Sequence, residues 1–149
     1  MNLQKFIATL SISLLPLQMV NAQAPNPITA AAAQEAGAVV TASGLVYRSL
    51  REGTGASPQA TDRVKVHYRG TLPDGKEFDS SYQRNEAIEF RLNGVIKCWT
   101  EGVQKMKVGG KSKLTCPPAI AYGERGAGGV IPPNATLIFE VELLGINGK

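Results

Sequence analysis

Short alternating runs of apolar and polar residues, separated by Gly, Pro and Asp, fill the chain from Gly44 onward and constrain its fold most strongly. The clearest run is Thr136 to Leu144, where every second residue is apolar. Its inward residues are Leu137, Phe139, Val141 and Leu143. This alternation is typical of strands that bury one face. Similar runs at Arg63 to Arg69, Ala87 to Leu92 and Ser112 to Cys116 predict an antiparallel sheet.

One helix is expected to cover that sheet. The apolar pair Val95-Ile96 leads into a segment that carries the only tryptophan, Trp99. Thr100 to Lys107 is long enough for about two helical turns, and Gly109-Gly110 provides a stop. We therefore predict an α+β fold, in which an antiparallel sheet is laid over one short α-helix.

The first 22 residues have the features of an export signal. Lys5 supplies a positive start, an apolar run extends from Phe6 to Val20, and Val20-Asn21-Ala22 is a small-residue cleavage site. The alternative is a membrane anchor, but polar residues interrupt the run and it is shorter than the roughly 20 residues of a membrane span. We predict a cleaved signal peptide over 1–22 and a periplasmic or secreted protein that is not attached to the membrane.

Residues 23–43 are rich in Ala, Gln, Pro and Asn and contain few large apolar groups, so we expect a flexible Ala-rich tether. A helix over Ala30 to Ala36 is compatible with the composition, but isolated helices this short are marginal in water. The folded domain is expected to occupy 44–149. Residues 121–134 form a loop with four glycines and two prolines, and long loops of this kind are usually functional.

The charge pattern excludes several classes of function. The net charge of +4 falls to +3 on signal cleavage, and the basic residues are scattered among acids, so a nucleic-acid patch is not supported. The single histidine, His67, faces outward on its strand, which argues against a hydrolase. One histidine and two cysteines offer no metal-ligand spacing, and no cofactor is expected.

Six segments in order resemble the FKBP-type peptidyl-prolyl cis-trans isomerases, and most closely the exported bacterial members similar to the macrophage infectivity potentiator group. The segments are Val66–Gly70, Asp74–Ser81, Val95–Gly102, Ala121–Gly123, Ile131–Pro133 and Leu137–Leu143. The resemblance covers about Ser43 to Ile146, which corresponds to the catalytic domain. It implies an FKBP-like fold, in which an antiparallel sheet of five to six strands wraps around one short α-helix. It also implies the isomerisation of X-Pro bonds in exported proteins that are folding.

The resemblance also implies the site residues. Trp99 would form the floor of a proline pocket. The residues expected to act on the amide are Tyr68, Asp79, Tyr122 and Phe139. The remaining substrate-binding residues are expected to be Phe78, Arg84, Ile88, Val95, Ile96 and Ile131. In this family the N–H matching Ile96 and the hydroxyl matching Tyr122 bond to ligand carbonyls. Whether Asp79 acts on the amide or only shapes the site is left open.

Three positions depart from the family pattern. Ile88 stands where many members have an aromatic residue, Ala127 stands where some have histidine, and Cys98 replaces the usual glycine before the tryptophan. Cys116 faces inward on the strand that the helix should cover. In an oxidising compartment these two cysteines are expected to form a disulfide, the alternative being two buried free thiols.

The resemblance further implies partners. Unfolded proline-containing polypeptides would be substrates, and tacrolimus- or rapamycin-like macrolides would be inhibitors. The alternative function is that of a proline-binding holdase chaperone with little turnover, which would use the same apolar groove. We expect a monomer, because the chain lacks the long N-terminal helical segment through which some relatives dimerise.

Overall fold

The computed structural model describes residues 26–147 and contains one antiparallel sheet with helices on it. The strands are β1 (Ala38–Val40), β2 (Val46–Arg51), β3 (Arg63–Thr71), β4 (Glu77–Ser80), β5 (Ile88–Arg91), β6 (Lys111–Cys116) and β7 (Leu137–Ile146). The α-helices are α1 (Pro27–Ala33) and α2 (Lys97–Val103). Short 3-10 turns lie at Leu92–Gly94 and Pro118–Ile120.

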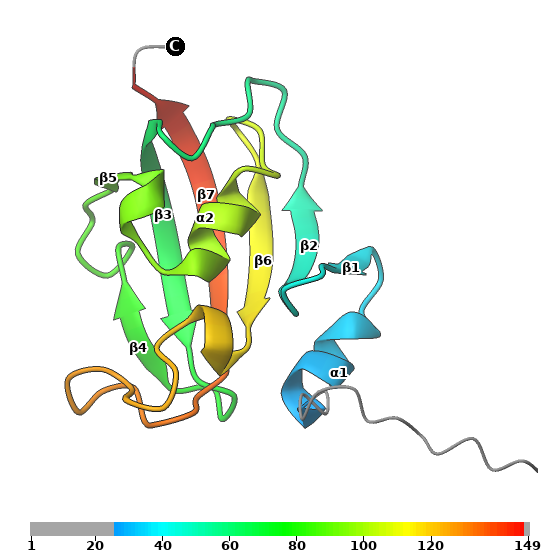
Figure 1. Ribbon diagram of the computed structural model, residues 1–149. Coiled ribbons are helices and arrows are strands. Elements are labelled where there is room, and N and C mark those ends of the chain that lie inside the picture. The colour runs from blue at the N-terminus through cyan, green and yellow to red at the C-terminus, as the bar shows by residue number, and fades with distance from the viewer. Residues whose placement is uncertain (1–25, 148–149) are drawn as a thin grey trace, which may run out of the picture.

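The sheet has the strand order β1-β2-β6-β7-β3-β4, and β5 pairs with β3 off this path. Every pairing is antiparallel. In Figure 1, α2 crosses one face of the sheet in front of β3, β7 and β6. The expected α+β fold is therefore confirmed. The sheet holds seven strands rather than five to six.

The alternation in the sequence places the core between α2 and the inner face of the sheet. Val64, Val66 and Tyr68 of β3 are buried, while Lys65 and Arg69 are exposed. All four apolar residues expected to face inward on β7 are buried as well. Period-two patterning thus predicted correctly which side of each long strand meets the helix.

Helix α2 begins and ends earlier in the chain than the sequence pattern predicts. Its range is Lys97–Val103, whereas we expected Thr100 to Lys107. The helix begins early because the Ile96 carbonyl already accepts from Thr100, and it ends early because Lys105 and Met106 donate their backbone N–H groups to the carbonyls of Gly102 and Val103, three residues back. A tight turn of this kind ends an α-helix while still burying Met106.

The expectation of a flexible tether over 23–43 is wrong where the structure describes it. Residues 26–40 contain α1 and β1, and β1 pairs with β2. Asn26 caps α1 and donates its side-chain amide to Thr136 (2.9 Å). Glu35 forms ion pairs with Arg48 (2.7 Å) and Lys113 (2.6 Å). These contacts stabilise a helix that would be marginal alone.

The expected export signal over 1–22 lies outside the described residues, as do residues 23–25 of the tether and the last two residues of the domain. Within residues 26–147, no helix has the length and apolar character needed to cross a membrane.

Candidate active site

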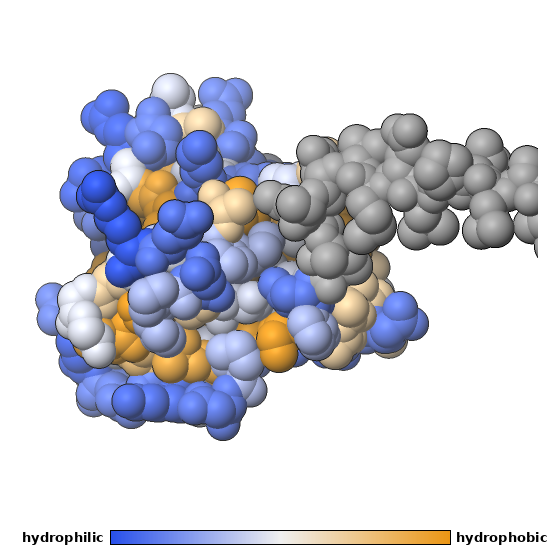
Figure 2. Space-filling view, turned by 60° about the horizontal axis from the view of Figure 1, so that its bottom comes forward, coloured by the Kyte–Doolittle hydropathy of each residue, from blue (hydrophilic) through white to orange (hydrophobic). Residues whose placement is uncertain are grey.

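A cavity of about 430 Å³ opens beside α2, between the sheet and the loop 121–134. Its lining is mainly aromatic and aliphatic. The lining residues are Tyr68, Phe78, Asp79, Ile88, Glu89, Phe90, Gly94, Val95, Ile96, Trp99, Tyr122 and Phe139. Figure 2 turns the lower end of Figure 1 toward the viewer and shows apolar patches between hydrophilic residues. An apolar cavity with few polar groups is the usual form of a small-molecule site.

Trp99 joins the cavity to the core. It is the third residue of α2, and only 5% of its surface is exposed. Its ring meets those of Tyr68 (5.1 Å), Phe90 (5.3 Å) and Phe139 (5.2 Å) between centroids. The contacts with Tyr68 and Phe139 are edge to face, an arrangement that is favourable between aromatic rings. In the described part of the chain, the Trp99 Nε1 is the one buried side-chain polar atom without a hydrogen-bond partner.

Two neighbouring residues of β4 both face the cavity because of a β-bulge. Gly70 of β3 pairs with Asp79, and the next residue of β3, Thr71, pairs with Glu77. Phe78 is therefore the extra residue on β4. Simple alternation would place Phe78 and Asp79 on opposite faces, whereas a bulge lets both line the cavity.

Asp79 is held by two donors at the edge of the cavity. The Tyr68 hydroxyl donates to one carboxylate oxygen, and Arg84 donates to the other (2.6 Å). Arg84 also donates to the Tyr68 hydroxyl (3.2 Å). Burial alone would raise the pKa of Asp79, but the hydrogen bonds from Tyr68 and Arg84 outweigh burial and lower it. Burial and the bond to Asp79 raise the pKa of Tyr68, so the phenol stays protonated as a donor.

This lowered pKa predicts an acid-sensitive contribution to stability. A carboxyl whose pKa is lowered on folding stabilises the protein above its unfolded pKa of about 3.9, and that contribution is lost as the pH falls through the folded value. We expect Asp79→Asn to lower the free energy of unfolding by about 0.5–1 kcal/mol at pH 6, after allowing for solvent screening. Urea unfolding at pH 6 and pH 3 measures this. The difference from wild type should shrink at pH 3.

Asp74→Asn is the matched control for Asp79→Asn, because Asp74 lies on an exposed turn and caps only the Lys76 N–H (2.9 Å). If the difference in unfolding free energy between wild type and Asp79→Asn is the same at pH 6 and pH 3, the role assigned to the Tyr68 and Arg84 contacts is contradicted.

The start of α2 presents backbone groups to the cavity. Ile96 is the N-cap residue, and its carbonyl accepts from the N–H groups of Trp99 and Thr100. Backbone N–H groups at a helix start have no acceptor within the helix. Ile96 lines the cavity, and as the N-cap residue its own N–H takes no part in the hydrogen bonding of α2.

The loop 121–134 supplies Tyr122, which lines the cavity and is 41% exposed. Four glycines of this loop have positive φ angles between 51° and 71°, a region that favours glycine. A Cβ at Gly126 would lie 2.1 Å from the Ile131 carbonyl oxygen. The loop therefore folds back on itself, and Ala127 and Ile131 form an isolated bridge.

Most residues expected in the site line the cavity. Ile131 does not: it is buried at 8% exposure in the core cluster. Arg84 does not line the cavity either and reaches the site through Asp79 and Tyr68. Our expectation omitted the lining residues Glu89, Phe90 and Gly94. The position of Phe90 could have been predicted from the sequence, because Phe90 lies two residues after Ile88 and therefore on the same face of the strand.

Cys98 and Cys116 tie the first turn of α2 to the end of β6. Their Cα atoms are 5.8 Å apart, and the structure joins them by a disulfide. Both residues are fully buried. Cys98 directly precedes Trp99, so this link fixes the backbone from which the cavity floor projects.

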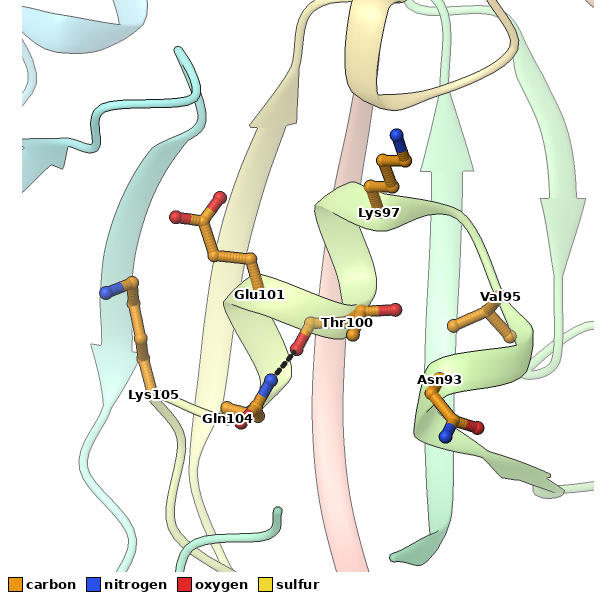
Figure 3. Close-up of a pocket in the computed structure, with 7 residues that line it drawn as sticks. All are labelled: Asn93, Val95, Lys97, Thr100, Glu101, Gln104 and Lys105. Carbon is orange, nitrogen blue, oxygen red and sulfur yellow. Dashed lines mark hydrogen bonds between the residues drawn. The ribbon is translucent and has the colours of Figure 1, made fainter. Parts of the chain in front are cut away.

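A second, larger groove of about 740 Å³ lies beside α2, and Figure 3 shows its seven lining residues. They are mainly polar or charged, and the Gln104 side chain bonds to the Thr100 carbonyl (2.7 Å). The groove has one aliphatic residue, Val95, which also lines the aromatic cavity. Because the groove lacks aromatic walls, we place the candidate site in the smaller cavity.

Comparison with known proteins agrees with the geometry. The family model described as FKBP-type peptidyl-prolyl cis-trans isomerase matches residues 55–144. The isomerase FkpA of Escherichia coli is 54% identical over 76% of this chain and 42% of its own length. FK506-binding protein 1 of Dictyostelium discoideum is 54% identical over 68% of this chain and 96% of its own.

A solved structure gives the same result. The peptidyl-prolyl cis-trans isomerase of Pseudomonas syringae is 41% identical, with a TM-score of 0.75 over 80% of this chain and 87% of its own. The chain spans less than half the length of the FkpA proteins that it matches. The family match covers most of the described domain, including nearly all residues of the strands that line the cavity. The chain therefore belongs to the FKBP-type peptidyl-prolyl cis-trans isomerase family.

Proposed function

We propose that this protein accelerates the cis-trans isomerisation of X-Pro peptide bonds in polypeptides that are folding. The observation that carries the proposal is the cavity with Trp99 as its floor and aromatic rings as its walls. Its volume of about 430 Å³ admits a proline ring with adjoining backbone.

The reaction needs no covalent step. Rotation about the peptide bond crosses a barrier of roughly 18–20 kcal/mol, because amide resonance is lost in the twisted state. Uncatalysed X-Pro exchange takes tens of seconds or longer. Water stabilises the planar, polarised amide through its carbonyl oxygen. A dry cavity withdraws that stabilisation and so favours the twisted form relative to the planar one.

The lining residues suit this chemistry. Trp99 offers a flat surface for the proline ring, and Phe78 and Phe139 bound the slot from β4 and β7. We assign the Ile96 N–H and the Tyr122 hydroxyl the role of holding a carbonyl as it rotates, because both residues line the cavity. Among the described lining residues there is no Ser, Thr, Cys or His to act as a nucleophile. His67 bonds to Ser81 (2.8 Å) and does not line the cavity.

We assign Asp79 a shaping role. Its carboxylate is occupied by Tyr68 and Arg84, so it fixes the orientation of the Tyr68 ring against Trp99. A charge held by two donors is less available to act on a substrate amide. Tyr68, Asp79 and Arg84 thus stabilise one wall of the cavity, while Ile88 and Val95 contribute aliphatic surface.

Exchange in an X-Pro peptide tests the proposal. We expect the wild type to accelerate cis-to-trans exchange and Tyr122→Phe with Asp79→Ala to reduce kcat/KM by about tenfold or more, through loss of carbonyl contacts and wall geometry. Tyr82→Phe with Asp74→Ala makes the same chemical changes at exposed positions outside the cavity and should stay near wild type.

Absence of acceleration by the wild type would end the enzyme proposal. If the wild type binds proline peptides without accelerating exchange, the protein acts as a holdase chaperone instead. If both double variants lose activity equally, the cavity is not the site of the reaction.

The proposed setting is outside the cytoplasm. The signal-like residues 1–22 and the bonded Cys98–Cys116 pair both suit an exported protein. The mass of the protein recovered from the periplasm should show cleavage after Ala22, and an uncleaved cytoplasmic chain would contradict export. We also propose a monomer that binds macrolides of the tacrolimus type, and a dimeric mass by light scattering would overturn the monomer.

A further inference from the structure

Gly70 lies at the centre of the cavity wall although it contributes no side chain. It is buried on β3, two residues after Tyr68, so it shares the inward face. Across the sheet it pairs with Phe139 of β7 on one side and with Asp79 of β4 on the other. It also stands opposite the bulge that carries Phe78.

A side chain at Gly70 would collide with both ring walls. A Cβ there would lie 2.5 Å from Phe78 Cζ and 2.9 Å from Phe139 Cε1. Unbonded carbon atoms pack at about 3.5–4.0 Å, so the Phe78 ring would have to move by about 1 Å or more. The two rings now meet edge to face with centroids 5.6 Å apart.

The free space around these rings decides which one would move. Phe139 is 4% exposed and is backed by Trp99. Phe78 is only partly buried and borders the cavity. The cavity gives the Phe78 ring space to move into, and such a displacement would make the slot above Trp99 narrower.

We propose that Gly70 is a positioning residue that sets the width of the proline slot by leaving room for the Phe78 and Phe139 rings. The role rests on the proposed isomerase function of the same cavity. It acts on the fit of the substrate ring, so a change at Gly70 should raise KM more than it lowers kcat.

Gly70→Ala tests this, with Gly145→Ala as the matched control. Gly145 also lies in a strand, and a Cβ there would have no neighbour within 4 Å. We expect kcat/KM of Gly70→Ala to fall about tenfold, mainly through KM, because small displacements in a tight site are costly. Gly145→Ala should stay within about twofold of wild type.

A compensating change separates positioning from a general loss of structure. Phe78→Leu removes the Phe78 ring atoms that the new methyl group would strike, and it leaves space into which the Phe139 ring can shift. Gly70→Ala should therefore weaken activity much less in the Phe78→Leu background than in the wild type. If Gly70→Ala does not fold, the comparison between the combined Gly70→Ala, Phe78→Leu variant and Phe78→Leu alone carries the test by itself.

Two results would overturn the inference: Gly70→Ala behaving like Gly145→Ala, or the combined variant being much weaker than Phe78→Leu alone. Failure of the proposed function looks different, because the wild type itself would then fail to accelerate X-Pro exchange. In that case the affinity for tacrolimus, measured through the change in Trp99 fluorescence, still tests the effect of Gly70 on the width of the slot. Gly70→Ala should weaken this binding about tenfold relative to wild type. Equal affinity of Gly70→Ala and wild type, or absence of tacrolimus binding by the wild type, would reject the role of Gly70.

Discussion

Trp99→Ala is expected to lower kcat/KM for X-Pro exchange by about 100-fold and the free energy of unfolding by about 3–5 kcal/mol. The ring is the floor of the cavity and contacts three other rings that line it, those of Tyr68, Phe90 and Phe139. Its removal therefore opens the slot and leaves a hole in the core. Initial rates of exchange and urea unfolding measure the two effects.

Trp99→Phe separates the effect of the aromatic face of Trp99 from that of its Nε1–H. Phenylalanine keeps an aromatic face but removes the Nε1–H, which has no partner among the described residues. An unpaired buried donor costs about 1–3 kcal/mol, so its loss offsets part of the lost packing. We expect Trp99→Phe to fall between wild type and Trp99→Ala in both activity and stability.

Met106→Ala is the control for stability alone. Met106 is buried in the same core but does not line the cavity. Its truncation should cost about 2–5 kcal/mol of unfolding free energy, yet leave kcat/KM near wild type where the variant is folded. Equal activity losses in Met106→Ala and Trp99→Ala, at a temperature where both are folded, would contradict the assignment of Trp99 as the floor.

Reduction of the Cys98–Cys116 disulfide is expected to lower the free energy of unfolding by about 3 kcal/mol. The bond closes a loop with a sequence separation of 18 residues, and the chain-entropy model gives this magnitude for such a loop. The Cα separation of 5.8 Å is ordinary for a disulfide. Urea unfolding of the wild type with and without reductant measures the effect.

Cys98→Ala with Cys116→Ala provides the control, because its stability should not respond to reductant. Thiol titration of the unfolded, unreduced protein should find no reactive thiol, and two thiols would contradict the bond. Because Cys98 precedes the floor residue, we also expect reduction to raise KM for an X-Pro peptide.

The long strands and their inward faces could be predicted because each run of alternation is decided locally. The inward residues of β3 and β7 follow directly from period two. Residues 26–40 could not be predicted in this way. Their order depends on partners more than 60 residues away, as in the contacts of Asn26 with Thr136 and of Glu35 with Lys113.

The site shows the same division between local pattern and tertiary contact. Tyr68 and Phe139 are inward by alternation, and the family motifs point to Trp99 and Tyr122. Alternation fails at Phe78 and Asp79, where a bulge turns neighbouring residues to the same cavity. Ile131 was expected as a wall, but it is not among the residues that line the cavity, and it forms a bridge with Ala127 within the loop.

The central claim is that the aromatic cavity itself performs the isomerisation. The most direct measurement is exchange NMR of an X-Pro peptide with a catalytic amount of the protein, before and after one equivalent of tacrolimus. We predict that the protein accelerates exchange and that the macrolide, by filling the cavity over Trp99, abolishes the acceleration. Absence of acceleration, or acceleration that persists with the macrolide shown to be bound, would contradict the claim.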